Sequence, residues 1–103
     1  MKIKLIQERK IVYNMTYYVI QVDIDGVKYG IQQRSDDNGY EYYVQSENLN
    51  DGEMMDVYDM EDEELLGIIL KLANSAHDRD LFSAENVGKD IDLEDLEDLE
   101  DLD

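Results

Sequence analysis

Cysteine is absent from this 103-residue chain, histidine occurs once, and basic residues are scarce. Without cysteine, the chain forms no disulfide bonds and no thiolate zinc site, and it has no cysteine nucleophile. No stretch approaches the roughly 20 apolar residues that cross a bilayer, and the first residues lack the apolar run of a signal peptide. We therefore expect a cytoplasmic protein with a single compact core.

Charge is distributed unevenly along the chain. There are 27 acidic and 9 basic side chains, which gives a net charge of −18. Residues 1–50 carry 7 acidic and 6 basic side chains, whereas residues 51–103 carry 20 acidic and 3 basic ones. Such an acidic half repels nucleic acid and anionic membranes and attracts positively charged protein surfaces. We predict a basic protein partner and no direct contact with nucleic acid or membrane.

Residues 2–47 have the pattern of an antiparallel sheet, because runs of β-branched and aromatic residues alternate with turn signals. These runs occupy residues 17–24, 27–34 and 40–45. Asp25-Gly26 separates the first two runs, and both residue types tolerate the positive φ of a tight hairpin turn. The pattern predicts a meander of three to four strands. Residues 54–58 fit either a further short strand or an extended lead-in to a helix.

A helix is predicted over residues 61–77, with Asp59 as its N-cap. Four acidic residues occupy its first turn, where the helix dipole favours negative charge, and its apolar residues recur on one face. Ser83 is a candidate cap for a second, short helix over residues 84–91. The predicted fold class is therefore α+β, a meander packed by one main helix.

The last twelve residues are of low complexity. Residues 92–103 repeat Leu-Glu-Asp and contain eight acidic side chains and no basic one. Leucines at every third position drift by about 60° per step around a helix, so they make a poor docking stripe. We expect a single domain over residues 1–91 and a largely disordered acidic tail over residues 92–103, which could become helical on a basic partner.

Two acidic segments are candidate partner-binding sites. The first, between residues 51 and 64, has eight carboxylates, and no basic residue occurs from 48 to 70. It fits either a solvated helix entry or a surface that imitates a phosphate backbone. The tail fits either a solubilising extension or a flexible arm for a basic groove. The candidate residues are Asp51, Glu53, Asp56, Tyr58, Asp59, Glu61, Asp62, Glu63 and Glu64 in the first segment and Glu94, Asp95, Glu97 and Asp98 in the tail.

Catalytic and metal-binding motifs are not found in the sequence. His77, the single histidine, falls at the end of the predicted helix, where a capping role is expected. The turns at 23–26 and 36–39 lack the twelve-residue spacing of a calcium loop. No nucleophile elbow, phosphate loop or zinc-binding helix motif is present. We predict a protein that is not an enzyme and needs no cofactor or metal.

The tyrosines offer an alternative binding surface. Eight tyrosines lie in the β-rich part of the chain, and strand alternation must place Tyr42 and Tyr43 on opposite faces. Exposed tyrosine is enriched in binding hot spots. This favours a second hypothesis, an adaptor that binds a partner through its tyrosine-rich sheet while the acidic tail serves solubility. A third is an acidic chaperone or antitoxin-like protein that masks a basic partner.

In size, charge, lack of cysteine and sheet-plus-helix layout, the chain resembles the small acidic inhibitors encoded by phages and mobile elements. That class includes DNA mimics that inhibit uracil-DNA glycosylase, restriction enzymes or Cas9. The resemblance implies a bacterial host and an inhibitor that occupies a basic nucleic-acid cleft. An anti-CRISPR protein against a Cas9-type nuclease is its most specific form. By this analogy, residues 51–64 and the tail would take the place of the DNA.

Overall fold

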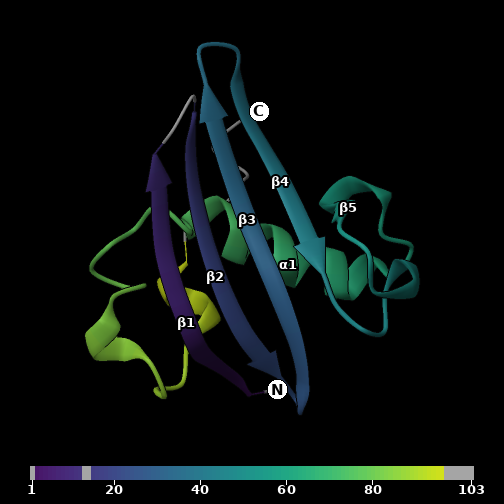
Figure 1. The fold of residues 1–103 in the computed structure, drawn as a ribbon. Coiled ribbons are helices and arrows are strands. Elements are labelled where there is room, and N and C mark those ends of the chain that lie inside the picture. The colour runs from purple at the N-terminus through teal and green to yellow at the C-terminus, as the bar shows by residue number, and fades with distance from the viewer. Residues whose placement is uncertain (1, 13–14, 97–103) are drawn as a thin grey trace.

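The computed structural model describes residues 2–12 and 15–96. Five antiparallel strands form one sheet, in which each strand pairs with the next along the chain (Figure 1). They are β1 (Ile3–Val12), β2 (Thr16–Ile24), β3 (Val27–Asp36), β4 (Gly39–Gln45) and β5 (Met55–Asp56). The α+β prediction is confirmed, and the sheet has five strands rather than three to four. Asp25 and Gly26 form the predicted tight turn, with φ of 51° and 92°.

The main helix is shorter than predicted. α1 spans Glu63–Ser75, and its N-cap is Asp62, whose carboxylate accepts a hydrogen bond from the Leu65 amide at 3.1 Å. Asp59 instead belongs to the 3-10 turn η2 (Val57–Asp59), because the buried Met60 side chain places that turn against the core. Within the ranges that the structure describes, no helix is both long and apolar enough to cross a membrane.

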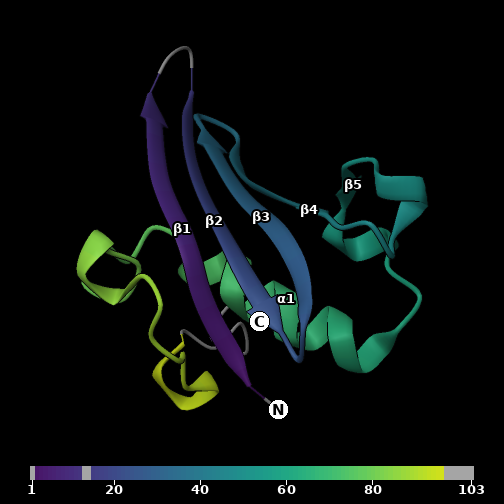
Figure 2. The same cartoon turned by 60° about the horizontal axis from the view of Figure 1, so that its bottom comes forward.

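The core lies between α1 and one face of the sheet. Side chains from alternate positions of the strands are fully buried there, namely Leu5, Ile20, Val22, Ile31 and Val44, and Ile69 and Leu72 of the helix meet them. Gln33 joins the two layers, since its Nε2 donates to the carbonyl oxygens of Ala73 and Asn74 at 3.1 and 3.0 Å. The opposite face of the sheet has no helix over it in the described part of the chain (Figure 2).

The segment after α1 runs back to the free edge of β1. Two 3-10 turns lie in it, η3 (Ala84–Asn86) and η4 (Leu93–Asp95). Between them, the Gly88 amide donates to the Leu5 carbonyl at 2.7 Å, and the Leu5 amide donates to the Lys89 carbonyl at 3.1 Å. The prediction of a helix over 84–91 is wrong, because only Ala84–Asn86 form a 3-10 turn, Gly88 takes a positive φ, and residues 88–91 form hydrogen bonds with β1 instead.

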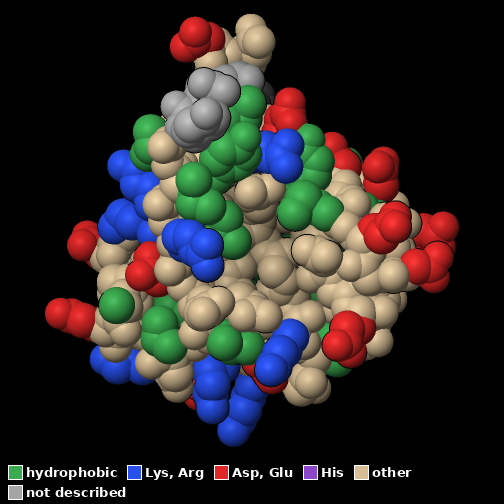
Figure 3. Space-filling view, in the orientation of Figure 1, with side chains coloured by type: hydrophobic (Ala, Val, Ile, Leu, Met, Phe, Trp, Pro, Cys, Tyr) green, Lys and Arg blue, Asp and Glu red, His purple; other side chains and the backbone are tan. Residues whose placement is uncertain are grey.

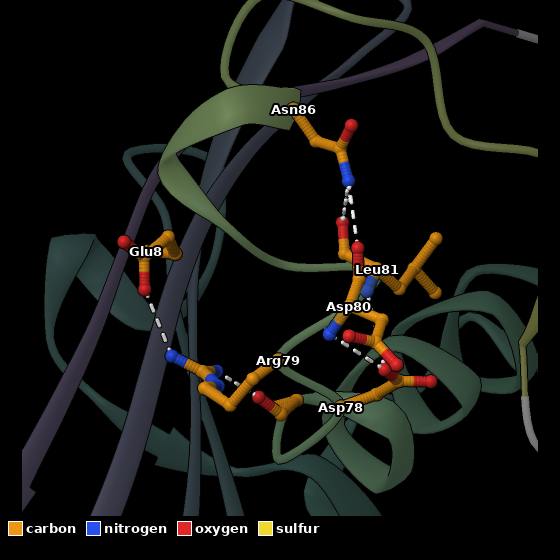
Figure 4. A network of polar contacts seen from close by, with 7 residues as sticks. Glu8, Asp78, Arg79, Asp80, Leu81 and Asn86 are labelled. Carbon is orange, nitrogen blue, oxygen red and sulfur yellow. Dashed lines mark hydrogen bonds and ion pairs between the residues drawn. The ribbon is translucent and has the colours of Figure 1, made fainter.

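A local network of polar contacts fixes the start of this segment (Figure 4). The Asp78 carboxylate accepts from the amides of Asp80 and Leu81, and the Asn86 side chain donates to the carbonyls of the same two residues. Arg79 forms an ion pair of 2.8 Å with Glu8 of β1. The segment is therefore tied both to itself and to the sheet edge.

The predicted start of the tail at residue 92 is also corrected. Leu96 is only 7% exposed and belongs to the hydrophobic core, and Leu93 packs against that core. The Asp92 carboxylate accepts from the Glu94 amide and so caps η4. Residues 92–96 are thus part of the folded domain, because their leucines find an apolar surface beside β1. The rest of the predicted tail, residues 97–103, lies outside the described residues.

Candidate protein-binding surface

An acidic ridge borders the sheet along β5. It runs from the 3-10 turn η1 (Asn50–Gly52) through β5 and η2 into the first turn of α1. Its carboxylates are those of Asp51, Glu53, Asp56, Asp59, Glu61, Asp62, Glu63 and Glu64. All are exposed except Asp56, which is half-buried. Figure 3 shows acidic side chains gathered on the side of the molecule that β5 and its flanking turns form. The structure thus brings the first predicted segment together as one surface.

Two of the eight carboxylates have a structural role. Asp56 accepts from the Tyr58 amide at 2.9 Å and caps η2, and Asp62 caps α1. The other six make no hydrogen bond and no ion pair within residues 2–12 and 15–96, where the one ion pair found joins Arg79 to Glu8. Capping and the helix dipole therefore account for part of the ridge only. Most of its charge therefore faces solvent without a counter-ion among the described residues.

Two large apolar side chains lie exposed within the ridge. Met54 is 45% exposed and Tyr58 is 61% exposed. Neither adds to the core, and carboxylates flank both of them in the sequence. Aromatic and methionine side chains are enriched at protein interfaces, whereas a surface that only keeps a protein soluble is usually free of them. The ridge therefore combines charge with apolar contact area.

The predicted tail residues do not join the ridge. Glu94 and Asp95 are exposed in η4, beside β1, whereas the ridge adjoins β5 at the opposite edge of the sheet. Figures 1 and 2 both place η4 and β5 on opposite sides of the molecule. Glu97 and Asp98 lie outside the described residues. The two candidate segments therefore form separate surfaces in the part of the chain that is described.

The uncovered sheet face has a different character. Four basic residues project from it, two on β1 and two on β3: Lys4, Arg9, Lys28 and Arg34. The Arg34 guanidinium lies over the rings of Tyr17 and Tyr43, at 5.3 and 4.2 Å from their centroids. A hydrogen bond from the Tyr43 hydroxyl to Glu41 raises the pKa of that phenol. These tyrosines already stack on a cation of their own chain.

The remaining tyrosines divide between the core and the surface. Tyr42 is 6% exposed on the inner face while Tyr43 lies on the outer face, as strand alternation predicts. Tyr18 also contacts cations of its own chain, since Lys10 and Arg79 lie 5.7 and 5.0 Å from its ring centroid. Tyr40 is exposed at the β3–β4 hairpin. Tyr13 lies outside the described residues.

A groove opens where the β2–β3 turn meets the start of α1. This helix-entry groove has a volume of about 320 Å³. Its lining is Ile24, Asp25, Val27, Tyr29, Asp62, Glu64, Leu65 and Ile68. Burial, and then the Asp62 carboxylate, raise the pKa of the Tyr29 phenol. The sequence does not predict this groove, because no local pattern indicates that Asp25 and Asp62 will line the same groove. Only the packing of α1 on the sheet brings them there.

A second hollow lies on the uncovered sheet face. It measures about 600 Å³ and lies between the β2–β3 turn and the loop after β4. Its lining is mainly uncharged and polar, and its two charged side chains, Lys28 and Glu47, have opposite signs. Unlike the helix-entry groove, this hollow therefore shows no preference for one charge.

The carboxylates of the ridge are spread out rather than convergent. Among the described residues, no three histidine, aspartate or glutamate side chains are placed to hold a metal ion. Comparison of the chain with family models, curated proteins and solved structures gave no match.

Proposed function

We propose that the protein inhibits a nucleic-acid-binding protein by placing its acidic ridge in that protein's basic cleft, where the ridge takes the position of DNA. The observation that carries this proposal is the exposure of Met54 and Tyr58 among carboxylates that form no ion pair within residues 2–12 and 15–96. Carboxylates would pair with arginine and lysine of the cleft, while the two apolar side chains would fill gaps between them. The most specific form of the proposal is an anti-CRISPR inhibitor of a Cas9-type nuclease.

The charge of the ridge determines how such binding should respond to salt. Charge-led association is fast at low ionic strength and slows steeply as salt screens the two surfaces. Because the Debye length falls to about 3 Å at 1 M salt, the association rate should drop much more than the dissociation rate rises. Equal affinity in low and high salt would contradict the proposal.

Affinity capture with matched variants tests where the partner binds. The ridge variant is Asp59→Asn with Glu61→Gln, Glu63→Gln and Glu64→Gln. The control variant removes the same charge on the β1 side, through Asp80→Asn, Glu85→Gln, Glu94→Gln and Asp95→Asn; all eight side chains are exposed. Capture of a nucleic-acid-binding protein that only the ridge variant loses, and that duplex DNA displaces, is the expected result. A partner that stays bound while DNA occupies its cleft would overturn the proposal.

The alternative function is an adaptor that binds through the uncovered sheet face. It is supported by the absence of any helix over that face in the described ranges and by the basic side chains that it carries. Arg9→Glu with Lys28→Glu reverses the charge of this face at two exposed positions. If this variant loses the partner and the ridge variant keeps it, the adaptor function is correct and the mimic is not. We rank the adaptor function second because the Arg34 guanidinium of this chain already lies over the rings of Tyr17 and Tyr43.

A further inference from the structure

The helix-entry groove has a lining of two kinds. Its floor is apolar, built from buried Ile24 and Ile68 with the partly buried Val27 and Leu65. Its rim carries the exposed carboxylates of Asp25, Asp62 and Glu64, and no cationic side chain lines it. At about 320 Å³ the groove is at the lower end of the size range of ligand pockets. It therefore suits one long side chain better than a cofactor.

The rim carboxylates retain binding capacity. One oxygen of Asp25 accepts from the Lys2 amide at 2.8 Å, and one oxygen of Asp62 accepts from the Leu65 amide. An ionised carboxylate has about four acceptor sites on its two oxygens, so both residues have sites to spare. The Glu64 carboxylate makes no hydrogen bond within the described ranges. Three acidic residues thus line one small groove.

Tyr29 adds a neutral polar group to the lining of this groove. Its side chain is 93% buried, being 7% exposed, and it lines the groove. Its hydroxyl makes no hydrogen bond to any residue from 2–12 or 15–96. Among the described residues, the buried polar atoms that lack a hydrogen bond are Gln33 Oε1 and Arg79 Nε, so the Tyr29 oxygen is open to solvent and can accept a hydrogen bond from a ligand in the groove. The raised pKa of this phenol keeps it protonated, as a donor and an acceptor.

We propose that the helix-entry groove binds an arginine side chain of the partner, with the aliphatic stem on Ile24 and Leu65 and the guanidinium between the rim carboxylates and the Tyr29 hydroxyl. Arginine fits better than lysine, because its planar group offers five donors, forms bidentate pairs with carboxylates and is the more weakly hydrated of the two. This inference rests on the proposed function, since it names the side chain that a basic cleft would insert. Asp62 and Glu64 belong to both surfaces, so the groove is continuous with the ridge.

The test uses a blocked peptide, acetyl-Gly-Arg-Gly-amide, added to the intact protein and followed by amide and aromatic NMR shifts. The comparison peptide has citrulline, which is nearly isosteric with arginine and uncharged. We expect the arginine peptide to shift the signals of Val27, Tyr29, Leu65 and Ile68 more than ridge signals outside the groove. The citrulline peptide should bind at least about tenfold more weakly, because it lacks the charge-assisted hydrogen bonds. Equal binding of the two peptides would overturn the inference.

Matched variants separate the groove from general acidic attraction. The groove variant is Asp25→Asn, Asp62→Asn and Glu64→Gln; asparagine tolerates the positive φ of residue 25 and serves as an N-cap at residue 62. The control variant, Asp51→Asn, Glu53→Gln and Asp59→Asn, removes the same charge elsewhere on the ridge. We expect the groove variant to weaken the arginine peptide at least about fivefold and the control less than about twofold.

The outcomes distinguish this inference from the proposed function. If both variants weaken the peptide equally, the groove is not a specific site, and the inference fails while the ridge proposal stands. If the peptide binds in the groove but no DNA-displaceable partner is captured, the proposed function fails and the arginine site stands. Tyr29→Phe adds an independent readout, since loss of the hydroxyl should weaken the arginine peptide by about two- to fivefold. An unchanged affinity would show that the Tyr29 hydroxyl does not contact the arginine side chain.

Discussion

At the scale of single residues, Gln33 carries the most consequential polar contact of the core. Its side chain is 1% exposed. Its amide nitrogen donates hydrogen bonds to two carbonyl oxygens at the end of α1, those of Ala73 and Asn74. The Nε2 atom also lies 3.3 Å from Nδ1 of His77, while Oε1 is buried without a hydrogen bond among the described residues. The position of Nε2 therefore requires a hydrogen-bond donor, because an acceptor atom there would be repelled by the two carbonyl oxygens.

Gln33→Glu tests this requirement. The substitution buries a carboxylate against two carbonyl oxygens, so we expect the free energy of unfolding to fall by about 3 kcal/mol or more. Urea denaturation measures the loss. The matched control is Gln32→Glu on the opposite face of β3, where the side-chain oxygen accepts from Arg34 Nε at 3.0 Å. The control should be neutral or slightly stabilising, because it pairs a carboxylate with a guanidinium. Equal losses in both variants would refute the role given to Gln33.

Tyr29 makes stability depend on pH at the alkaline end. Burial and Asp62 raise the pKa of its phenol above the ordinary value of 10.0, so the unfolded chain releases this proton before the folded one does. Stability is therefore full below about pH 10 and falls as the pH rises through the raised folded pKa.

Tyr29→Phe tests this dependence and should remove part of the fall in stability above pH 10, as measured by urea denaturation across the alkaline range. The Tyr43 phenol, whose pKa is also raised, accounts for a further part. Asp62→Asn should reduce the contribution of Tyr29 without abolishing it, because burial is the larger cause. An alkaline slope identical in the wild type and Tyr29→Phe would contradict this account.

At the scale of elements, α1 could be made more stable at one position, Gly67. Gly67 is exposed in the middle of this helix, and a Cβ added there meets nothing within 4 Å. Gly67→Ala should therefore raise the free energy of unfolding by about 0.5–1 kcal/mol, because alanine loses less backbone entropy on folding. The contrast is Gly26→Ala, at a φ of 92° in the β2–β3 turn, which should destabilise. A higher melting temperature for the first variant and a lower one for the second is expected.

The sequence predicted those elements whose signals are local. Strand alternation, the Asp25-Gly26 turn and the apolar face of α1 each depend on residues a few positions apart, and all three are confirmed. The sequence does not decide between a strand and an extended segment at residues 54–58, because the two residues of β5 are too few for a periodic pattern. The prediction of a helix over 84–91 is wrong because residues 88–91 form hydrogen bonds with β1 in place of helical ones. Such a tertiary contact leaves no trace in local propensity.

The candidate sites divide in the same way. Exposure of the ridge follows from its composition, and the structure places its residues on one border of the sheet. The helix-entry groove could not be predicted, since it unites the β2–β3 turn with the start of α1 across the sheet-helix interface. The burial of Leu96 could not be predicted either, because the Leu-Glu-Asp repeat looks the same at every step and gives no local sign of which leucine meets the core.

At the scale of the whole molecule, the net charge of −18 opposes the compact state. Six ridge carboxylates have no counter-ion within residues 2–12 and 15–96, so their mutual repulsion contributes to that opposition. Added sodium chloride should therefore raise the midpoint of thermal unfolding between 50 and 500 mM, since the Debye length shortens from about 14 to about 4 Å over this range. The ridge variant described above should show a smaller rise. A midpoint independent of salt would show that the ridge charges are too far apart to matter.

The contact between residues 88–91 and β1 also bears on the order in which the protein folds during synthesis. Strands β1 to β5 pair only with their neighbours, so each can add to the growing sheet as it leaves the ribosome. The edge of β1 near Leu5 must then wait for Gly88 and Lys89, almost the whole length of the chain later. Until Gly88 and Lys89 have been synthesised, the nascent chain exposes an unpaired strand edge to other nascent chains on the same mRNA. The charged side chains of Glu8, Arg9 and Lys10 on that strand are well placed to keep neighbouring chains apart during this interval.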